Sequence, residues 1–486
     1  MLDSTSLLAF ILGFLILTFT VKRKESKKTV LVTSYTRNLP LPPGPKPWPI
    51  IGNLPEILWR NKPVFRWIHS LMEELNTDIA CIRLANTHVI PVTSPRIARE
   101  ILKKQDSIFA TRPLTMGTEY SSRGYLTIAV EPQGEQWKKM RRVVASHVTC
   151  QKSFRWTLEQ RTEEADNLVR YINKLCKGSE GIDVRHVVRQ YSGNVARKML
   201  FGVRHFGKGS EDGSGPGFEE IEHVDSLFKV VTHLYAFALS DYVPWLRFLD
   251  LEGHEKVVSG AMRNVSKYND PLVDKRLDLW RNGKMNEPQD FLDMLILAKD
   301  TNGKPALSDE EIKAQVTELM LATVDNPSNA VEWAMAEMIN EPNIMKKAVE
   351  EVDRIVGKDR LACVKEAFRL HPVAPFNLPH MSTADAVVDG YFIPKGSHVL
   401  ISRLGIGRNP NVWDKPLNAG RRGCMGSNIG SAMTYMLLAR LIQGFTWSSM
   451  PGEDKVDITE SKTDLFMAKP LHAVGTPRLA PHVYSI

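Results

Sequence analysis

The sequence contains little cysteine for its length. Only five cysteines occur among 486 residues, and no two of them lie close together in the chain. A disulfide framework is therefore not expected, and neither is a structural zinc site, which needs closely spaced Cys or His ligands. Such sparse cysteines are typical of a protein whose main body stays in a reducing compartment.

Several nucleotide-binding and catalytic motifs are also absent. No GxGxxG opens an expected helix and no P-loop is present, so the sequence shows no phosphate-binding loop for a dinucleotide or a nucleoside triphosphate. A GxSxG nucleophile elbow is missing as well. The net charge of +8 is concentrated in residues 1–50, where seven Lys and Arg residues face two acidic residues. The rest of the chain is close to balanced, so nucleic acid is not an expected partner.

The N-terminus does contain a long apolar run. Residues 5–21 form seventeen uncharged positions, followed directly by KRKESKK. At about 1.5 Å per residue, this run reaches the short end of what spans a bilayer. The basic residues follow the run, whereas in a cleaved signal peptide they precede it, and the positive-inside rule then keeps the body cytosolic. We predict a membrane signal anchor over 1–21; a cleaved peptide and an artefactual start are the alternatives.

Prolines dominate the next segment, LPLPPGPKPWPIIGNLP, residues 39–55. Repeated proline favours stiff, extended chain. We predict a basic linker over 22–39 and a proline-rich hinge over 40–50. If Trp48 and residues 50–54 pack on the body, this hinge can also fix the orientation of the body on the membrane. The body, residues 51–486, is predicted to be mainly α with small β-sheets (α+β), with β-like pieces at 79–94 and 387–402.

The clearest helix is expected over residues 308–342. Ser308 and Glu311 have the spacing of a capping box, and Pro342 ends the helix. In the middle, Pro327 removes a backbone donor, so a kink is expected there. The kink would expose a carbonyl beside Asp325 and Asn326, which can hold water; alternatively, Asp325 only caps the second half of the helix.

One cysteine stands in an unusual setting, AGRRGCMG, residues 419–426. Glycines at 420, 423 and 426 permit a tight backbone around the sulfur. Two arginines precede Cys424, and a helix is expected from about 427 to 443, so positive charge and a helix N-terminus favour a thiolate. A nucleophile would need a histidine base, and no motif identifies one. A metal ligand needs only the thiolate and room for the metal.

This loop resembles the cysteine loop of the haem-thiolate monooxygenases, the cytochrome P-450 family, whose pattern is F-x-x-G-x-R-x-C-x-G. Leu417 occupies the phenylalanine position, while Gly420, Arg422, Cys424 and Gly426 match. Other family landmarks follow in the expected order. WKKMR, residues 137–141, is similar to W-x-x-x-R, and KEAFR, residues 365–369, supplies E-x-x-R. The resemblance covers essentially the whole chain, including the anchor and the proline hinge of the microsomal members.

The resemblance implies a set of cofactor contacts and partners. Cys424 would be the axial thiolate ligand of a haem b iron. The haem propionates would be held by Arg422, Arg141, Trp137 and His380, of which His380 stands where many members have arginine. Glu366 and Arg369, at i and i+3, would form a structural ion pair. O2 would be the co-substrate, and NADPH would supply electrons through a separate reductase, an NADPH-cytochrome reductase. The protein would be a single-pass protein of the endoplasmic reticulum membrane, with its catalytic domain in the cytosol.

Two segments narrow the branch. DNPSNAVEWA and FNLPHMSTAD closely resemble segments of plant amino-acid N-monooxygenases, which hydroxylate an α-amino nitrogen twice to give an aldoxime for glucosinolate or cyanogenic glucoside synthesis. Asn326 and Pro327 replace the two hydroxyl residues of the usual distal motif. We hypothesise that Asn326 takes the oxygen-activating role, beside Asp325. An aliphatic or aromatic amino acid is expected as substrate, and the candidate contacts are Thr323, Phe376 and Phe466.

Two intervals are shorter than in the family, near 360–363 and 414–419. The second lacks the P-E-R-F-like motif, whose arginine joins the E-x-x-R pair. An incomplete buried charge network costs on the order of several kcal/mol. A splice variant, a mis-joined gene model or a decaying duplicate would each explain the shortening. The alternatives to an active N-monooxygenase are therefore a catalytically impaired or haem-free chain, and a cytochrome P-450 with a different substrate.

Overall fold

The computed structural model describes residues 39–59, 63–178, 181–210, 215–234, 236–354, 367–408 and 420–484. The predicted anchor, the linker up to residue 38, Glu366 and the two shortened intervals lie outside these ranges. Within the described ranges, no helix combines the length and the apolar character needed to span a bilayer.

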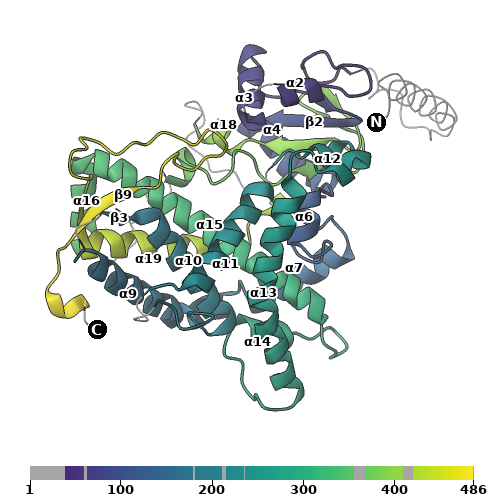
Figure 1. The fold of residues 1–486 in the computed structure, drawn as a ribbon. Helices are drawn as coiled ribbons and strands as arrows, with labels where there is room; N and C mark the ends of the chain where they lie inside the picture. The colour runs from purple at the N-terminus through teal and green to yellow at the C-terminus, as the bar shows by residue number, and fades with distance from the viewer. Residues whose placement is uncertain are drawn as a thin grey trace, which may run out of the picture.

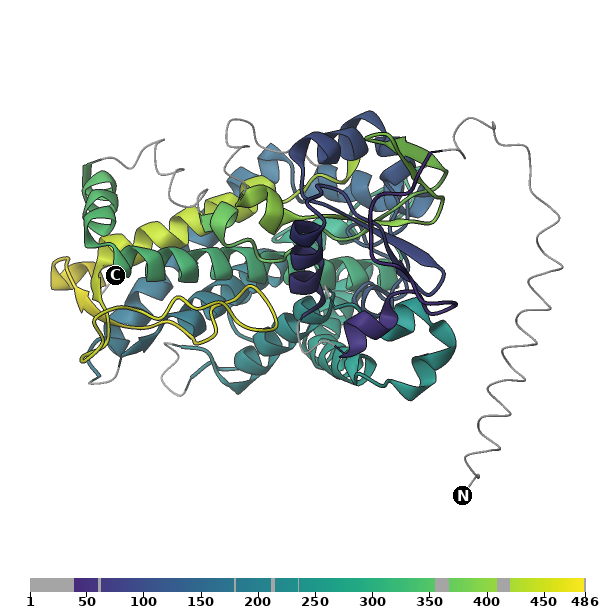
Figure 2. The ribbon, with the colours of Figure 1, turned by 90° about the horizontal axis from the view of Figure 1, so that it is seen from above.

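Helices form most of the described chain, which confirms the predicted mainly α fold (Figure 1). They pack into one large helical part, with the small sheets at its periphery (Figure 2). In chain order the helices are α2 (Leu54–Trp59), α3 (Val64–Glu74), α4 (Pro95–Arg99), η2 (Glu100–Lys104), α5 (Asp106–Phe109), α6 (Met116–Ser121), α7 (Glu135–His147), α8 (Gln151–Trp156), α9 (Leu158–Leu175), α10 (Val184–Phe201), α11 (Phe218–Leu234), α12 (Leu239–Tyr242), η3 (Pro244–Leu249), α13 (His254–Arg281), α14 (Phe291–Ile296), α15 (Asp309–Asn340), α16 (Pro342–Arg354), α18 (Arg403–Gly407), η5 (Gly420–Arg422), α19 (Ser427–Gly444) and η6 (Pro481–Tyr484).

The strands form small sheets that join distant parts of the chain. The largest has the order β1-β2-β7-β4, a second has the order β3-β9-β8, and β5 pairs with β6. In the largest sheet β7 runs parallel to β2 and antiparallel to β4. Both predicted β-like pieces contain strands of this sheet. The strands are β1 (Ile82–Leu84), β2 (Thr87–Val92), β3 (Ile182–Asp183), β4 (His380–Met381), β5 (Ala386–Val388), β6 (Tyr391–Ile393), β7 (His398–Ile401), β8 (Phe445–Ser448) and β9 (His472–Pro477).

The long helix α15 has the predicted ends. The Ser308 hydroxyl accepts from the Glu311 N–H at 3.3 Å, and the Glu311 carboxylate accepts from the Ser308 N–H at 2.8 Å. The helix runs for 32 residues, with Pro327 inside it, or about 48 Å at 1.5 Å per residue. Because the helix is continuous across this proline, Asp325 caps no second helix, and that interpretation of the sequence is wrong.

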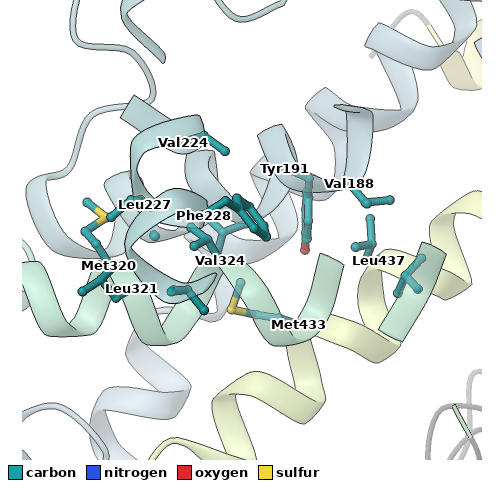
Figure 3. Packing of buried hydrophobic residues seen from close by; sticks show 14 of the residues in the cluster. Val188, Tyr191, Val224, Leu227, Phe228, Met320, Leu321, Val324, Met433 and Leu437 are labelled. Carbon is teal, nitrogen blue, oxygen red and sulfur yellow. The ribbon is translucent and has the colours of Figure 1, made fainter. Parts of the chain in front are cut away.

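The centre of α15 is buried among four other helices. It packs against α10, α11, α13 and α19, and side chains from three of these interlock with those of α15 in Figure 3. Val324 is completely buried there, with Met320 and Leu321 one turn earlier. Each such apolar side chain contributes about 1.5–3 kcal/mol when fully buried, so this crossing point is the core of the helical part.

The proline-rich segment is attached to the small sheets by its backbone. The Pro40 carbonyl accepts from the Phe392 N–H at 2.9 Å, and the Pro43 carbonyl accepts from the Cys81 N–H at 2.9 Å. Leu54 is buried, but Trp48 and Ile50 are 51% and 55% exposed. About half of each of these two side chains is therefore exposed to solvent, and the backbone hydrogen bonds of Pro40 and Pro43 attach the segment to the body.

Gly44 makes the closest backbone approach in this segment. A Cβ atom added at Gly44 would lie 1.9 Å from the Cys81 carbonyl oxygen, so Gly44→Ala forces the two backbones apart. We expect a loss of about 1–3 kcal/mol in the free energy of unfolding, measured by chemical denaturation. The control is Gly260→Ala in α13, where the nearest atom is 3.9 Å away and a gain of about 0.4–1 kcal/mol is expected. Equal stability of Gly44→Ala and the wild type would contradict the prediction.

Candidate active site

A cavity of about 440 Å³ lies between α15, α7 and the loop that leads into α19. It gathers seven of the residues singled out in the sequence, which come from four separate segments of the chain. They are Trp137, Arg141, Thr323, Asn326, His380, Arg422 and Cys424.

The cysteine loop forms one wall of this cavity. Cys424 is exposed and stands between η5 and α19, three residues before the first residue of the helix. A Cβ atom added at Gly426 or Gly430 would meet no atom within 4 Å. Because both glycines line the cavity, their missing side chains leave space beside the thiol. The sulfur therefore faces open volume close to the positive end of the α19 dipole.

Arg422 fastens this loop to the chain on the other side of the cavity. Its guanidinium donates to three backbone carbonyls, at 2.6 Å from Nε, 2.9 Å from one terminal nitrogen and 2.6 Å from the other. Burial lowers the pKa of Arg422 to about 10, so it stays charged at neutral pH. Two of its five donors remain for a ligand. The accepting carbonyls belong to Ala110, Ile128 and Glu131.

Trp137 in α7 carries a buried donor without an acceptor. Two guanidinium groups lie close to the ring, whose centroid is 4.5 Å from Cζ of Arg422 and 5.5 Å from Cζ of Arg141. Its Nε1 atom is buried and makes no hydrogen bond within the described residues. Buried indole N–H groups normally have a partner. Two cations and a free donor on one wall therefore form a site for an anionic ligand group.

His380 reaches the cavity from β4 in a neutral state. It is 3% exposed, and Nδ1 lies 2.8 Å from the Phe109 carbonyl oxygen. Burial, with the nearby Arg112 and Arg422, lowers the pKa of His380 to about 3. The neutral ring donates from Nδ1 to that carbonyl and has no second donor for a carboxylate. Contact with a propionate would require a second proton on His380.

The opposite wall is the middle of α15. Thr323, Asn326 and Pro327 line the cavity there. The Thr323 hydroxyl donates to the Leu319 carbonyl at 2.6 Å, so its proton is already used within the helix. Among the described residues, the Asn326 amide has no hydrogen-bond partner, and it keeps both a donor and an acceptor. Asn326 is therefore the polar group of α15 that can act on a bound molecule.

Asp325 does not line this cavity. It is 3% exposed, and its Oδ1 has no partner among the described residues. Burial raises the pKa of the Asp325 carboxyl to about 7, against the opposing effect of Arg189 and Arg403. Successive helical residues point about 100° apart, so Asn326 lines the cavity while Asp325 does not, and Asp325 lies within electrostatic range of Arg189 on α10. The structure gives Asp325 no place at the reacting centre.

Two further polar residues shape the cavity and carried no signal in the sequence. The Glu318 carboxylate accepts from the backbone N–H groups of Ile128 and Ala129, at 3.1 and 2.7 Å. Arg112 donates to the Ala129 carbonyl at 3.1 Å and to the Pro379 carbonyl at 2.9 Å. Their partners are backbone groups of distant loops, so no motif reveals them. Together with Arg422 they hold residues 128–131 against the cavity.

A smaller pocket of about 50 Å³ adjoins the cavity. Arg112, Asn377 and Leu378 line both spaces. Phe376, a predicted substrate contact, lines the smaller pocket rather than the main cavity, and its ring stacks on His69 with centroids 5.2 Å apart.

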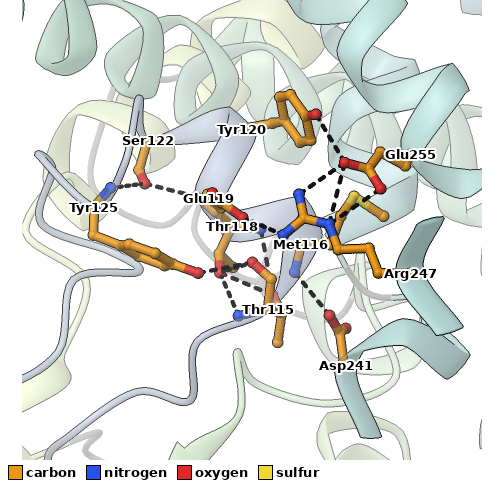
Figure 4. A network of polar contacts seen from close by, with 10 residues as sticks. All are labelled: Thr115, Met116, Thr118, Glu119, Tyr120, Ser122, Tyr125, Asp241, Arg247 and Glu255. Atoms are coloured by element: carbon orange, nitrogen blue, oxygen red, sulfur yellow. Dashed lines mark hydrogen bonds and ion pairs between the residues drawn. The ribbon is translucent and has the colours of Figure 1, made fainter. Parts of the chain in front are cut away.

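Figure 4 shows a polar network that includes Met116 and Asp241, two residues that line this pocket. The Met116 N–H donates to Asp241 Oδ1 at 2.7 Å, which links α6 to α12. Arg247 in η3 pairs with Glu119 of α6 at 2.7 Å and with Glu255 of α13 at 2.8 Å. One guanidinium shared by two carboxylates fixes the relative position of three helical segments.

The remaining predicted residues lie elsewhere. Phe466 borders a separate groove, where its ring contacts Phe228 with centroids 6.3 Å apart. Arg369 donates to the Gly407 carbonyl at 2.8 Å. Its predicted partner Glu366 is outside the described residues, so the pair between them stays a prediction.

The residues present at the cavity fit a haem. Cys424 offers a thiolate to an iron, and the unpartnered indole N–H of Trp137 stands with Arg141 and Arg422 where two propionates need donors. The open faces of Gly426 and Gly430 leave room for a flat ring. A thiolate at one wall and an anion site at the edge form the donor set of a haem-thiolate centre.

Comparisons with known proteins agree with this donor set. The family model described as cytochrome P-450 matches residues 42–418 and 418–474. A phenylalanine N-monooxygenase of Arabidopsis thaliana is 77% identical over 528 aligned residues, which cover 100% of each chain. A tryptophan N-monooxygenase of Prunus mume is 52% identical over 98% of this chain and 96% of its own. A tyrosine N-monooxygenase of Sorghum bicolor is 47% identical, over 100% and 96%.

Solved structures agree at the level of the fold. Two zebra fish cytochrome P-450 structures, one with abiraterone and one with progesterone, superpose with TM-scores of 0.68 and 0.69. Each covers 86% of this chain and 100% of its own, at 21% and 22% identity. The chain has 486 residues, fewer than the 528 aligned with the Arabidopsis relative, so that relative has residues without a counterpart here.

The buried Asp325 should make stability depend on pH. Because the pKa of its carboxyl is about 7 when folded and about 3.9 when exposed, the folded protein alone keeps a proton between these values. Stability is therefore lost as pH rises from about 4 to about 7. Asp325→Asn should match the wild type near pH 4 and exceed it at pH 8 by a few kcal/mol, at about 1.4 kcal/mol per pKa unit, in chemical denaturation.

The matched control is Asp225→Asn, since Asp225 is exposed to water and should show no such gain. A stabilisation by Asp325→Asn that is equal at pH 4 and pH 8 would show that the charge of this carboxyl is not responsible.

Proposed function

The chain belongs to the cytochrome P-450 family, and on that basis we propose that it N-hydroxylates an aromatic amino acid, with phenylalanine as the first candidate, and yields the aldoxime. The observation that carries the proposal is that Asn326 of α15 and Cys424 line the same cavity. The proposed substrate class follows the relatives that act on phenylalanine, tryptophan and tyrosine.

The chain's own residues would perform the binding and orientation. Cys424 would ligate the haem iron, while Trp137, Arg141 and Arg422 hold the propionates at the edge of the cavity. When bound, the haem supplies the binding and reductive activation of O2, with electrons from NADPH delivered by a separate reductase. Glu318 and Arg112 hold the loop at residues 128–131 in place through backbone hydrogen bonds.

Asn326 would replace the hydroxyl group that usually serves at this point of the long helix. Its amide is unpartnered within the described chain, so its N–H can donate to the reacting atoms without breaking a hydrogen bond first. The Thr323 proton is already committed to Leu319. The division of roles between these neighbours on α15 therefore favours Asn326 as the catalytic donor.

The smaller pocket is the proposed site of the substrate side chain. It shares Asn377 and Leu378 with the wall of the cavity and has Phe376 in its own wall. An aromatic ring placed there would leave the amino nitrogen in the main cavity. Phe376 would then contact the substrate from the side of the pocket, while Phe466, in a separate groove, would not.

We further propose attachment to the endoplasmic reticulum membrane, with the body in the cytosol and an aldoxime product that serves glucosinolate or cyanogenic glucoside synthesis. The apolar run at residues 5–21 and the basic residues after it support this location. Large apolar side chains near η3 support it independently, since Trp245, Phe248 and Leu251 are 62%, 81% and 64% exposed. Exposed apolar groups of this size commonly mark an interaction surface.

Reconstitution tests the proposed reaction. The full chain with a reductase, NADPH and O2 should convert phenylalanine to its aldoxime, faster than tryptophan, tyrosine or valine, as measured by mass spectrometry of the products. A red-shifted carbon monoxide band in the reduced protein should accompany this activity and vanish in Cys424→Ser. A haem-loaded chain that forms a product from none of these amino acids would overturn the proposed function. Absence of the band in the wild type would show that the shortened chain does not bind haem through a thiolate.

Asn326→Ala tests the proposed donor. Because the variant removes only the amide, haem content should stay the same while the aldoxime formed per NADPH consumed falls about tenfold or more, the scale of one lost catalytic donor. Asn326→Asp has a side chain of equal size but lacks the N–H donor, so its aldoxime yield per NADPH consumed should fall by a similar factor. Asn302→Ala in an exposed loop is the matched control. If the aldoxime formed per NADPH consumed is unchanged in both Asn326 variants, Asn326 has no role in the reaction.

A further inference from the structure

A second groove of about 400 Å³ lies between α10, α11 and the loop at residues 461–468. It shares no lining residue with the cavity that contains Cys424. Phe466 and Phe228 provide aromatic surface there, and charged side chains of both signs surround them. The volume lies within the range of small-molecule sites.

Arg189 is the central charged residue of this groove. Its guanidinium carbon lies 3.9 Å from the Phe228 ring centroid and 5.5 Å from that of Phe466. Within the described residues it makes no hydrogen bond and no ion pair. A guanidinium stacked by its face on aromatic rings still has its in-plane N–H groups available. Those groups form the planar fork that binds a carboxylate bidentately.

The neighbouring Arg185 is already neutralised. Its Nε donates to the buried carboxylate of Glu332 at 2.8 Å, and a terminal nitrogen donates to the Met467 carbonyl at 2.7 Å. The charge available to a ligand therefore comes from Arg189 and from the exposed Lys229 on the positive side.

Two carboxylates face these cations. Asp225 and Asp464 line the groove, and neither makes an ion pair within the described part of the chain. Asp464 accepts a hydrogen bond from the Phe466 N–H at 3.0 Å, which fixes its carboxylate beside the ring. Two free cations and two free carboxylates balance one another. A ligand with both charges would fit this arrangement better than a simple anion or cation would.

We propose that this groove is a second binding site for a free aromatic amino acid, with the carboxylate on Arg189, the ammonium group near Asp464 or Asp225, and the ring against Phe466. The choice of an amino acid agrees with the charge pattern of the groove and also rests on the proposed function. The site is separate from the cavity in which the reaction takes place, so its occupancy is counted in addition to that of the substrate.

The test counts bound phenylalanine and cavity occupancy separately. Equilibrium dialysis of radiolabelled L-phenylalanine with the haem-loaded full chain gives the total number of ligands bound. The change in the haem absorption spectrum reports the cavity alone. The wild type should bind two equivalents, whereas Arg189→Gln should bind one with an unaltered spectral change. The matched control Arg263→Gln, an exposed arginine on α13, should bind two. A single equivalent in the wild type that is accompanied by the full spectral change, or two equivalents in Arg189→Gln, would overturn the proposal.

Further probes identify the ligand chemistry and guard against misfolding. Phenethylamine and 3-phenylpropanoate each lack one charge and should displace the second equivalent about tenfold less well, the loss expected for one charged hydrogen bond. Displacement by inorganic phosphate at equal concentration would overturn the amino-acid assignment. If Arg189→Gln loses its haem, Lys229→Gln and Phe466→Leu test the same groove, and an unchanged second affinity in both would overturn the proposal.

The outcome also separates this inference from the proposed function. A spectral change and an aldoxime product without a second equivalent would leave the function standing and reject the groove. One equivalent that disappears in Arg189→Gln, without any spectral change in the wild type, would support the groove and reject phenylalanine as the substrate of the cavity.

Discussion

The burial of α15 is the constraint on which the rest of the structure depends. The helix is 32 residues long, and its centre is surrounded by α10, α11, α13 and α19. Polar groups at such depth must find partners or change their charge state. Glu332 does the first, with Arg185 and the Leu471 N–H. Asp325 does the second, since burial raises the pKa of its carboxyl to about 7. Among the described residues of α15 that line the cavity, Asn326 is the polar side chain without a hydrogen-bond partner, so it is the one available to a bound molecule.

The wall opposite α15 is held by hydrogen bonds from side chains to backbone groups rather than by pairs of side chains. Arg422 joins the cysteine loop to residues 110, 128 and 131, and Glu318 holds residues 128 and 129 from α15 itself. A loop rich in glycine loses much conformational entropy on folding. Several charge-assisted hydrogen bonds to one segment offset that cost and keep the thiol in a defined position.

The sequence predicted this site well where the chemistry is local. The cysteine loop, the W-x-x-x-R spacing on α7 and the capping box of α15 depend on residues within one or two helical turns, and the structure shows the capping box and brings the other residues to one cavity. Contacts between distant segments were harder to predict from the sequence. Phe376 and Phe466 were equivalent as sequence candidates, yet one lines the adjoining pocket and the other a separate groove. Nothing local distinguishes a loop arginine in water from Arg112, which is buried among carbonyls.

The attachment of the proline-rich segment also determines how the protein can be shortened for study. Removing an apolar N-terminus is a common way to raise soluble expression, and proline-rich connectors are convenient places to cut. Here the carbonyls of Pro40 and Pro43 accept from Phe392 and Cys81, and Gly44 fits against the Cys81 carbonyl with no space for a side chain. A cut after residue 44 would leave those two N–H groups without acceptors and expose the covered strand edge. Soluble versions of this chain should therefore begin before Pro40.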